Sequence, residues 1–447
     1  MIIGNVLKQR AMITPEREAL ISNGRIYTFN QLNERTNRMA NALLNLGVKP
    51  GDRIGLLMEN SSEFVEIYFA VAKIGAVLVP LNIRLAPPEQ DYILQDCSVD
   101  LFIFSHTFED KARQMESIHA MRCRIATGPS EVMNVLDYEE LIREASDQEP
   151  DVPVDENDLH VIMYSSGTTG HPKGVMLTHR NIFMGGLNLM IGLHYYYPDR
   201  CLLLVPLFHS GSLTPLIGHI VKGISTVFMN SFDAVGALQL IEKYQIKIMQ
   251  GVTAIMQMML QVPELESYDL KAWEIAILPG SPLPPEVIQE AKDRIGVLCQ
   301  NLWGLTEISG PGSLMNVEDI MRKPGSAGKP YFMVDLRIVD GQGKDAPRGE
   351  VGEIVLRGPH MMQGYWNLPE ATQEAIKDGW LYSGDMGKLD EEGYLYVVDR
   401  IKDMILSGGE NIYPAEIEAV VSEMPGVKGA SLIGVPDEMG RSREDVH

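Results

Sequence analysis

The sequence is poor in cysteine, in positive charge and in long apolar runs, and each shortage excludes a class of protein. Its four cysteines are scattered over 447 residues without a CxxC pair, so neither a disulfide framework nor a cysteine zinc site is expected. The sequence has only 38 basic residues against 60 acidic ones, and the resulting formal net charge of -22 disfavours binding to nucleic acid or to an anionic membrane. No segment reaches the roughly 18 apolar residues that a bilayer span needs, and the N-terminus lacks a signal-peptide pattern. We expect an unprocessed cytoplasmic protein of undetermined oligomeric state.

Several catalytic signatures are also missing. The sequence contains neither the GxSxG elbow of a serine hydrolase nor an HExxH zinc pair. Residues 341–346 loosely resemble a dinucleotide fingerprint, but Pro347 follows them. Since no helix can open there, we interpret this stretch as a turn.

The chain does contain alternating apolar strands and helices. Residues 30–47 have helical spacing and end at Gly47, and residues 62–74 also read as a helix. Short apolar runs, typical of buried parallel strands, surround them. The expected strands are 53–58, 76–81, 101–104, 201–204 and 246–250. With 45% hydrophobic residues to form large cores, this pattern predicts an α/β fold with largely parallel sheets.

The texture changes in the last quarter of the sequence. From residue 324 to 399 glycines multiply and short strands at 334–339, 353–356 and 394–398 alternate with turns, which predicts a β-rich subdomain. We therefore expect an N-terminal domain over residues 1–399, made of two α/β subdomains and this β-rich one. A partial α+β C-terminal lid over residues 400–447 is expected to follow. Its predicted elements are a strand near 404–406, a helix from Pro414 and a strand near 431–435.

The strongest local signal is the segment Tyr164–Gly174, YSSGTTGHPKG, which follows the apolar residues Val161–Met163. Its small residues let backbone amides approach phosphate oxygens, and its hydroxyls and Lys173 can donate to them. It is not a Walker A loop, because glycine follows Lys173 where that motif needs Ser or Thr. A plain flexible loop is the alternative, but the defined pattern directly after a strand favours a triphosphate site.

This loop resembles that of the adenylate-forming superfamily, which includes acyl-CoA synthetases, luciferases and peptide-synthetase adenylation domains. The resemblance covers essentially the whole chain and is closest to AMP-forming ligases of fatty or aromatic acids with CoA. It implies ATP, Mg²⁺ and CoA as cofactor and co-substrates. The residues that it implies for ATP or AMP binding are Ser165, Ser166, Gly167, Thr168, Thr169, Gly170, Lys173, Gly280, Ser281, Pro282, Asn301, Trp303, Gly304, Thr306, Asp385 and Arg400.

The segment Asn301–Glu307 resembles the aromatic-Gly-x-Thr-Glu motif of the same superfamily. By resemblance, Thr306 contacts the α-phosphate and Glu307 coordinates magnesium, with Ser165 as the candidate second ligand. A hard divalent cation prefers such oxygen ligands. The family usually has tyrosine where Trp303 stands, so stacking on the base is expected without a phenolic hydrogen bond. The purely structural alternative is that these residues form a helix cap or present a carboxylate at the surface.

Two further segments resemble the ribose site and the lid of that superfamily. In Tyr382–Asp385 the acid Asp385 is expected to accept hydrogen bonds from both ribose hydroxyls, and Arg400 to reach the ribose or a phosphate. Lys402 falls at the hinge position, where rotation swings the lid between the two half-reactions. The residues expected near CoA are Ser407, Gly408 and Gly409.

The acyl substrate is less defined. His209 matches a histidine near the acyl channel, and Gly280 and Trp303 are expected to line the same pocket. No acidic residue obviously follows to hold a substrate ammonium, which disfavours an amino acid. The methionine-rich residues 253–260 could form an adaptable acyl pocket, although a core helix is favoured for most of them. The expected substrate is a small-molecule fatty or aromatic acid of undecided length.

The resemblance implies activation of this acid to acyl-AMP with release of pyrophosphate, followed by transfer to CoA. Lys173, Thr306 and Glu307 are the expected catalytic residues. The lid lysine of the family has no match, since Lys428 is the only lysine after the hinge and its context differs. The lid is therefore expected to be truncated, with ATP binding better preserved than adenylation. Transfer to a carrier protein, or a nucleotide-binding remnant without catalysis, are the alternatives.

Overall fold

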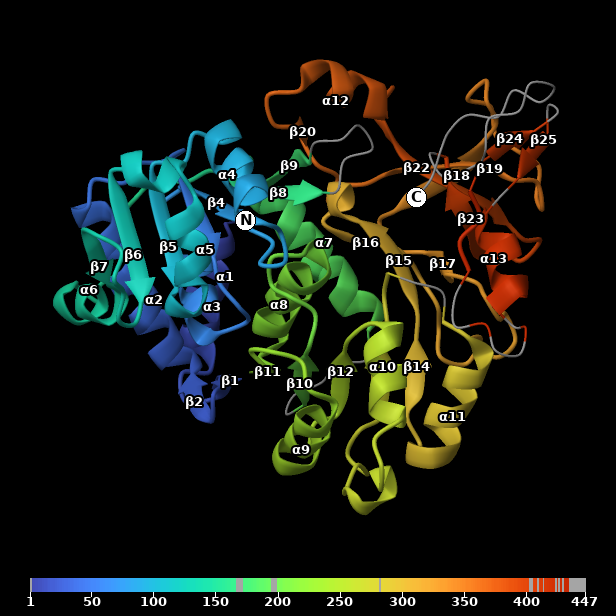
Figure 1. Ribbon diagram of the computed structural model, residues 1–447, viewed down its shortest axis with the longest axis horizontal. Coiled ribbons are helices and arrows are strands. Elements are labelled where there is room, and N and C mark those ends of the chain that lie inside the picture. The colour runs from blue at the N-terminus through green and yellow to red at the C-terminus, as the bar shows by residue number, and fades with distance from the viewer. Residues whose placement is uncertain are drawn as a thin grey trace.

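The computed structural model describes residues 2–165, 172–193, 199–280 and 283–401, followed by residues 405–407, 410–412, 414–422, 424, 427 and 430–433. Two units with large sheets lie side by side, and smaller antiparallel sheets adjoin them (Figure 1). This arrangement confirms the predicted α/β fold class. None of the helices in the described part of the chain combines the length and the apolar character that crossing a membrane requires.

One large sheet has eight strands, and those from β4 to β7 in its order pair in parallel, whereas β9 and β20 pair antiparallel at one edge. All three strands predicted within residues 53–104 belong to it. From edge to edge its strands are β20 (Gly364–Tyr365), β9 (Lys173–Thr178), β8 (Leu159–Ser165), β4 (Val77–Pro80), β3 (Arg53–Leu57), β5 (Leu101–Ser105), β6 (Cys123–Thr127) and β7 (Val135–Asp137).

The second large sheet has seven strands, all parallel to their neighbours except for β2 at one edge. The predicted strands at 201–204 and 246–250 are both found in it. Its strands, in spatial order, are β14 (Leu298–Gln300), β13 (Ile275–Ile277), β12 (Ile248–Gln250), β10 (Arg200–Leu203), β11 (Ser225–Phe228), β1 (Glu18–Ser22) and β2 (Arg25–Thr28). The N-terminal strand β1 thus pairs with a strand from the middle of the chain, with Leu20 opposite Thr226.

A layer of helices between the two sheets forms a core common to both. Alternate strand residues point to opposite faces, so Leu56 of β3 and Leu203 of β10 enter this common core, while Leu57 and Leu202 enter the outer cores. Helices that contribute to the common core are α1 (Ile3–Ile13), α2 (Phe29–Asn45), α3 (Ser62–Lys73), α6 (Tyr138–Glu144), α7 (His179–Gly192) and α8 (Ser210–Lys222). The outer layers are α4 (Pro87–Asp96) and α5 (Glu109–Gln114) on one side, and α9 (Ala234–Tyr244), α10 (Thr253–Leu260) and α11 (Pro285–Ile295) on the other.

The helix predicted at residues 30–47 is α2, and its ends follow local sequence rules. Thr28 accepts a hydrogen bond from the Gln31 backbone N–H, and the Gln31 side chain accepts one from the Thr28 N–H, which makes a capping box. Beyond the helix, Gly47 adopts a φ of 81°, a conformation that favours glycine.

The predicted β-rich region consists of antiparallel sheets. The larger one contains β18 (Asp335–Val339), β19 (Gly352–Arg357), β22 (Trp380–Leu389), β21 (Ile376–Lys377) and β23 (Leu395–Arg400). A smaller sheet contains β15 (Leu302–Leu305), β16 (Gly310–Leu314) and β17 (Lys329–Pro330), and the last one pairs β24 (Ile405–Ser407) with β25 (Glu410–Ile412). The remaining α-helices in the described ranges are α12 (Pro369–Ala375) and α13 (Pro414–Ser422).

The expected elements of the C-terminal region are met in part. Helix α13 begins at Pro414 as predicted, and β24 occupies the predicted strand near 404–406. The strand expected near 431–435 is not formed by residues 431–433, and the rest of that segment lies outside the described residues. The domain boundary near residue 400 stays a prediction.

Candidate active site

Two cavities adjoin at the carboxyl ends of the parallel strands β10, β12 and β13. One, the apolar cavity, has a volume of about 220 Å³, and the other, the polar cavity, about 660 Å³. They share the wall made by His209, Gly304, Leu305 and Thr306. Ligands of open α/β sheets bind at this edge of the strands, so the position alone marks a site.

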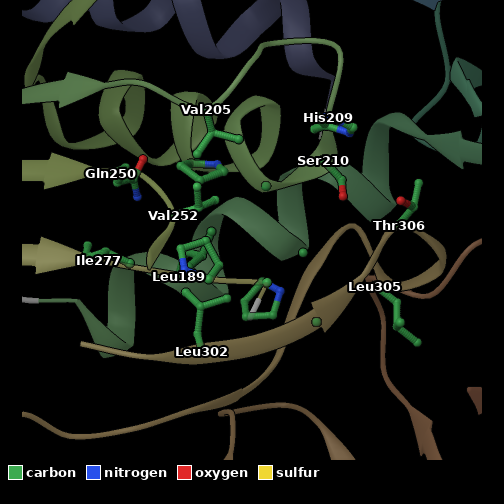
Figure 2. A pocket seen from close by; sticks show the side chains of 17 residues that line it. Leu189, Val205, His209, Ser210, Gln250, Val252, Ile277, Leu302, Leu305 and Thr306 are labelled. Atoms are coloured by element: carbon green, nitrogen blue, oxygen red, sulfur yellow. The ribbon is translucent and has the colours of Figure 1, made fainter. Parts of the chain in front are cut away.

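Aliphatic side chains surround the apolar cavity (Figure 2). Figure 2 shows Val205, Val252, Leu189 and Leu302 around it, with Gln250 and Ile277 toward the strand ends and Thr306 at the opposite end. Gly280 also lines it, as predicted for an acyl pocket, whereas Ser281 and Pro282 lie outside the described residues.

The methionine-rich helix α10 does not line the apolar cavity, apart from its N-cap residue Val252. Met256 and Met259 are buried in the outer core, while Met258 is exposed. The core interpretation of residues 253–260 is therefore met for Thr253, Met256, Met259 and Leu260, which are buried, and not for Ala254, Gln257 and Met258, which are exposed.

The two ends of the predicted phosphate loop lie in the wall of the polar cavity. β8 ends at Ser165 and β9 begins at Lys173, and these two residues are paired across the antiparallel strands. Both line the cavity. The intervening Ser166, Gly167, Thr168, Thr169 and Gly170 lie outside the described residues.

The β15–β16 hairpin carries Thr306 into the shared wall. A bulge falls between Trp303 and Gly304, and a Cβ added to Gly304 would lie 2.0 Å from the carbonyl oxygen of Gly310. Glycine is therefore required for the two strands to approach this closely. Asn301 is buried at the start of the hairpin but does not line either cavity.

Glu307 follows Thr306 and lines the polar cavity. Its Oε1 accepts a hydrogen bond of 3.0 Å from the hydroxyl of Tyr365. Desolvation by the surrounding protein raises the pKa of the Glu307 carboxyl above its ordinary value. The ammonium of Lys173 lies 5.0 Å from the centre of the Tyr365 ring.

Asp385 is held from both carboxylate oxygens. It pairs with Arg400 across β22 and β23, and Arg400 Nε lies 3.4 Å from Oδ1. On the other side, Trp303 donates from Nε1 to Oδ2 at 2.9 Å. An ionised carboxylate has about four acceptor sites, so a group such as Asp385 can accept from several donors at once. Asp385 and Arg400 both line the polar cavity, whereas Trp303 stands behind Asp385 and does not line either cavity.

His209 precedes α8 and borders both cavities. Desolvation by the surrounding protein, together with the charge of Arg84, lowers its pKa to about 4. The imidazole is therefore neutral at neutral pH and contributes no net charge to the place where the cavities adjoin.

The residues predicted for the hinge and for CoA are described in part. Ser407 ends β24, whereas Lys402, Gly408 and Gly409 lie outside the described residues. Their expected roles stay predictions.

The oxygen donors around the polar cavity suit a magnesium nucleotide. No group of three His, Cys, Asp or Glu side chains suited to a metal occurs among the described residues. Mg²⁺ is usually held by one or two carboxylates together with substrate phosphates and water. Glu307 and the Ser165 hydroxyl can supply the protein share of such a site.

Sequence patterns missed Tyr365, Ser383 and Asn82, which also line the polar cavity. Ser383 lies in the segment Tyr382–Asp385, two residues before the predicted ribose ligand Asp385, so that motif could have indicated it. Tyr365 reaches the cavity because β20 pairs with β9, a contact between residues about 190 positions apart that no local pattern reports.

Comparison with known proteins places the chain among adenylate-forming enzymes. Residues 7–366 match the family described as AMP-binding enzyme. The chain is 40% identical over 441 residues to the long-chain-fatty-acid–CoA ligase FadD13 of Mycobacterium tuberculosis, covering 98% of this chain and 86% of that protein. It is 37% identical over 438 residues to a feruloyl-CoA synthase of Amycolatopsis sp, covering 97% and 86%.

A solved structure of another CoA synthetase is similar to this chain in fold as well as in sequence. The O-succinylbenzoate CoA synthetase MenE of Bacillus subtilis, in complex with ATP and a magnesium ion, superposes with a TM-score of 0.87 at 32% identity. The match covers 98% of this chain and 88% of that one.

Proposed function

The chain belongs to the AMP-binding enzyme family, and we propose that it activates a carboxylic acid with ATP to acyl-AMP and then transfers the acyl group to CoA. The shared wall of the two cavities supports this reaction most directly. An apolar cavity suits the tail of an acid, the polar cavity suits a nucleotide, and a carboxylate at Thr306 and His209 would meet the α-phosphate between them.

In the first step, a carboxylate oxygen attacks the α-phosphorus of ATP and pyrophosphate leaves. Lys173 and Thr306 donate to phosphate oxygens, Asp385 accepts hydrogen bonds from the ribose hydroxyls, and Arg400 reaches the ribose or a phosphate. Catalysis then comes mainly from holding the reactants in line and from stabilising charge on the phosphates. Mg²⁺, on Glu307 with Ser165, would supply a cation for the phosphate oxygens.

In the second step, the thiolate of CoA attacks the acyl carbonyl carbon and AMP leaves. We assign the arm of CoA to Ser407, Gly408 and Gly409, and the rotation between the two steps to Lys402. Because His209 is neutral at neutral pH, its imidazole adds no positive charge of its own beside the activated carbonyl at the cavity junction.

We infer a fatty or aromatic acid as the substrate. The lining of the apolar cavity supports this, since the described residues around it include no cation for a second carboxylate and no anion for an ammonium group. The named substrates of relatives, a long-chain fatty acid and ferulate, belong to the same two classes.

The decisive experiment measures acid-dependent release of pyrophosphate with ATP and Mg²⁺ across a panel of fatty and aromatic acids. Thioester formation is then followed with free CoA and, separately, with a phosphopantetheinylated carrier protein. Release with acyl-CoA formation is expected. Thioester on the carrier alone would identify a carrier-loading enzyme, and ATP binding without release for any acid would contradict the proposal.

A further inference from the structure

Tyr365 lies against two side chains of opposite charge, Glu307, which the proposed function assigns to magnesium, and Lys173, which it assigns to phosphate. Its hydroxyl donates to the Glu307 carboxylate at 3.0 Å, and the Lys173 ammonium lies over its ring, 5.0 Å from the centre. Cations within about 6 Å of an aromatic centroid are attracted to the face of the ring. One side chain therefore contacts an anion at its polar tip and a cation on its face.

The backbone fixes Tyr365 relative to both partners. β20 lies beside β9 (Figure 1), the strand that begins with Lys173. In this pairing Tyr365 is opposite Val175. Just before β20, the Met362 N–H donates to the Glu307 carbonyl at 2.7 Å. The position of Tyr365 is thus tied to the segments that carry Lys173 and Glu307.

A lysine and a glutamate in one cavity attract each other, and in a partly buried site this attraction is strong. The ion pairs between residues that the structure describes do not include one between Lys173 and Glu307, although both line the polar cavity. Direct pairing would neutralise the two charges against each other. The carboxylate would then be less available to a metal, and the ammonium less available to phosphate.

We propose that Tyr365 is a positioning residue that separates Lys173 from Glu307 and orients both, so that each stays available for magnesium and phosphate. The ring separates the two charges, and the hydroxyl fixes the direction of the carboxylate. This inference rests on the proposed function for the roles of its two partners, but its test does not depend on turnover.

The test compares Tyr365→Phe with Tyr365→Leu by calorimetric titration of the full chain with ATP, in the presence and absence of Mg²⁺. Tyr365→Phe keeps the ring and loses the hydroxyl, so the gain in ATP affinity on adding Mg²⁺ should fall about fivefold, while affinity without Mg²⁺ stays within twofold. Tyr365→Leu should weaken binding under both conditions, because Lys173 and Glu307 then pair directly.

A double variant separates positioning from simple support of the fold. If Tyr365 acts through Glu307, adding Tyr365→Phe to Glu307→Gln should cause no further loss of the Mg²⁺ effect. Losses that multiply in the double variant would overturn the proposal. Equal losses with and without Mg²⁺ in Tyr365→Phe would overturn it as well.

Trp366→Phe is the matched control. Trp366 adjoins Tyr365, donates to the carbonyl of Asp96 at 3.1 Å and does not line either cavity, so its loss should leave both affinities unchanged. Failure of the wild-type chain to release pyrophosphate would contradict the proposed function and still leave the Mg²⁺ effect measurable. A wild-type ATP affinity that ignores Mg²⁺ would contradict the role of Tyr365.

Discussion

The indole of Trp303 helps to fix the orientation of the Asp385 carboxylate. Its N–H donates to Asp385, whose other oxygen faces Arg400, so the carboxylate is held between a neutral donor and a cation. Hydrogen bonds to a charged group contribute more than those between neutral groups. The family usually has a tyrosine at this position. This chain has Trp303 instead, and its indole holds Asp385, the carboxylate that is expected to bind the ribose.

Replacing Trp303 tests this arrangement. Trp303→Phe removes the donor, and the resulting mobility of Asp385 should raise KM for ATP about fivefold with little change in kcat, consistent with a loss of roughly 1 kcal/mol. Steady-state kinetics with varied ATP measure it. Trp380→Phe is the control, since Trp380 stacks on Arg337 and Arg357 elsewhere. An unchanged KM for ATP would show that Asp385 needs no support from the indole.

Filling the apolar cavity tests its assignment to the acid. Val252 lines it (Figure 2), and the larger side chain of Val252→Phe would fill part of the volume of about 220 Å³. We expect KM for the acid to rise by at least about tenfold, because the tail no longer fits, while KM for ATP stays within about twofold. Val235→Phe, at an exposed position on α9, serves as control. A change in KM for ATP alone would contradict the assignment.

Among single residues, sequence patterns predicted the site residues that belong to contiguous motifs and missed those that stand outside a motif. Lys173, Thr306 and Glu307 stand in recognisable runs, and the structure brings them to one cavity. Tyr365 follows a single glycine and has no motif around it. Its contact with Glu307 depends on how distant strands pair, which local patterns do not encode.

The hairpin of β15 and β16 is an element whose geometry sets the site. Its strands approach so closely at Gly304 that a methyl group would overlap the backbone of Gly310, and the same strand leads directly to Thr306. Any separation of these strands therefore moves the shared wall of both cavities.

Gly304→Ala should disturb stability and activity together. The added methyl forces the strands apart, an overpacking cost of about 1–3 kcal/mol, which in a chain of this length should lower the unfolding temperature by about 1–3 °C. Displacement of Thr306 should reduce pyrophosphate release by at least about tenfold. Thermal melts and a release assay measure the two effects. Gly341→Ala, with no described atom within 4 Å of its added Cβ, should change neither.

Elements with complete local signals were predicted well, and those defined by distant partners were not. The spacing of α2 and the stop at Gly47 are visible in the sequence, and the short apolar strands before and after α3 are found as β3 and β4. By contrast, two-residue β20 owes its formation to β9, far along the chain, so its assignment requires the tertiary fold. The hairpin of β1 and β2 was missed for another reason, because its Asn23-Gly24 turn is a local signal that the strand patterns did not include.

Buried histidines make the whole molecule less stable in acid. His160, His179 and His219 have fully buried side chains, and desolvation lowers the pKa of His179 to about 4, that of His219 to about 3, and that of His160 well below its ordinary value. Their folded pKa values lie below the value of about 6.5 in the unfolded chain, so the unfolded chain binds more protons in between. These residues therefore destabilise the fold as pH falls from about 6.5 toward 4.

The unfolding temperature should accordingly fall between pH 7.5 and 5.0. Each fully shifted histidine contributes about 2 kcal/mol of loss by pH 5. His219→Gln keeps a polar group near Thr226, which His219 contacts at 3.0 Å, and removes one such titration. Its melting temperature should drop less than that of the wild type over this interval, whatever its stability at pH 7.5. Parallel drops in the two proteins would contradict this account.

The pairing of β1 with β11 also has a consequence for biosynthesis. About 200 residues separate the two strands, and a ribosome adding 5–20 residues per second needs roughly 10–40 s to make that length. During this interval β1 and β2 have only each other as neighbours in their sheet, and the apolar residues Leu20 and Ile21 of β1 have only part of their final surroundings. The nascent N-terminus is thus the segment on which we expect chaperones to act before the seven-stranded sheet closes around β11.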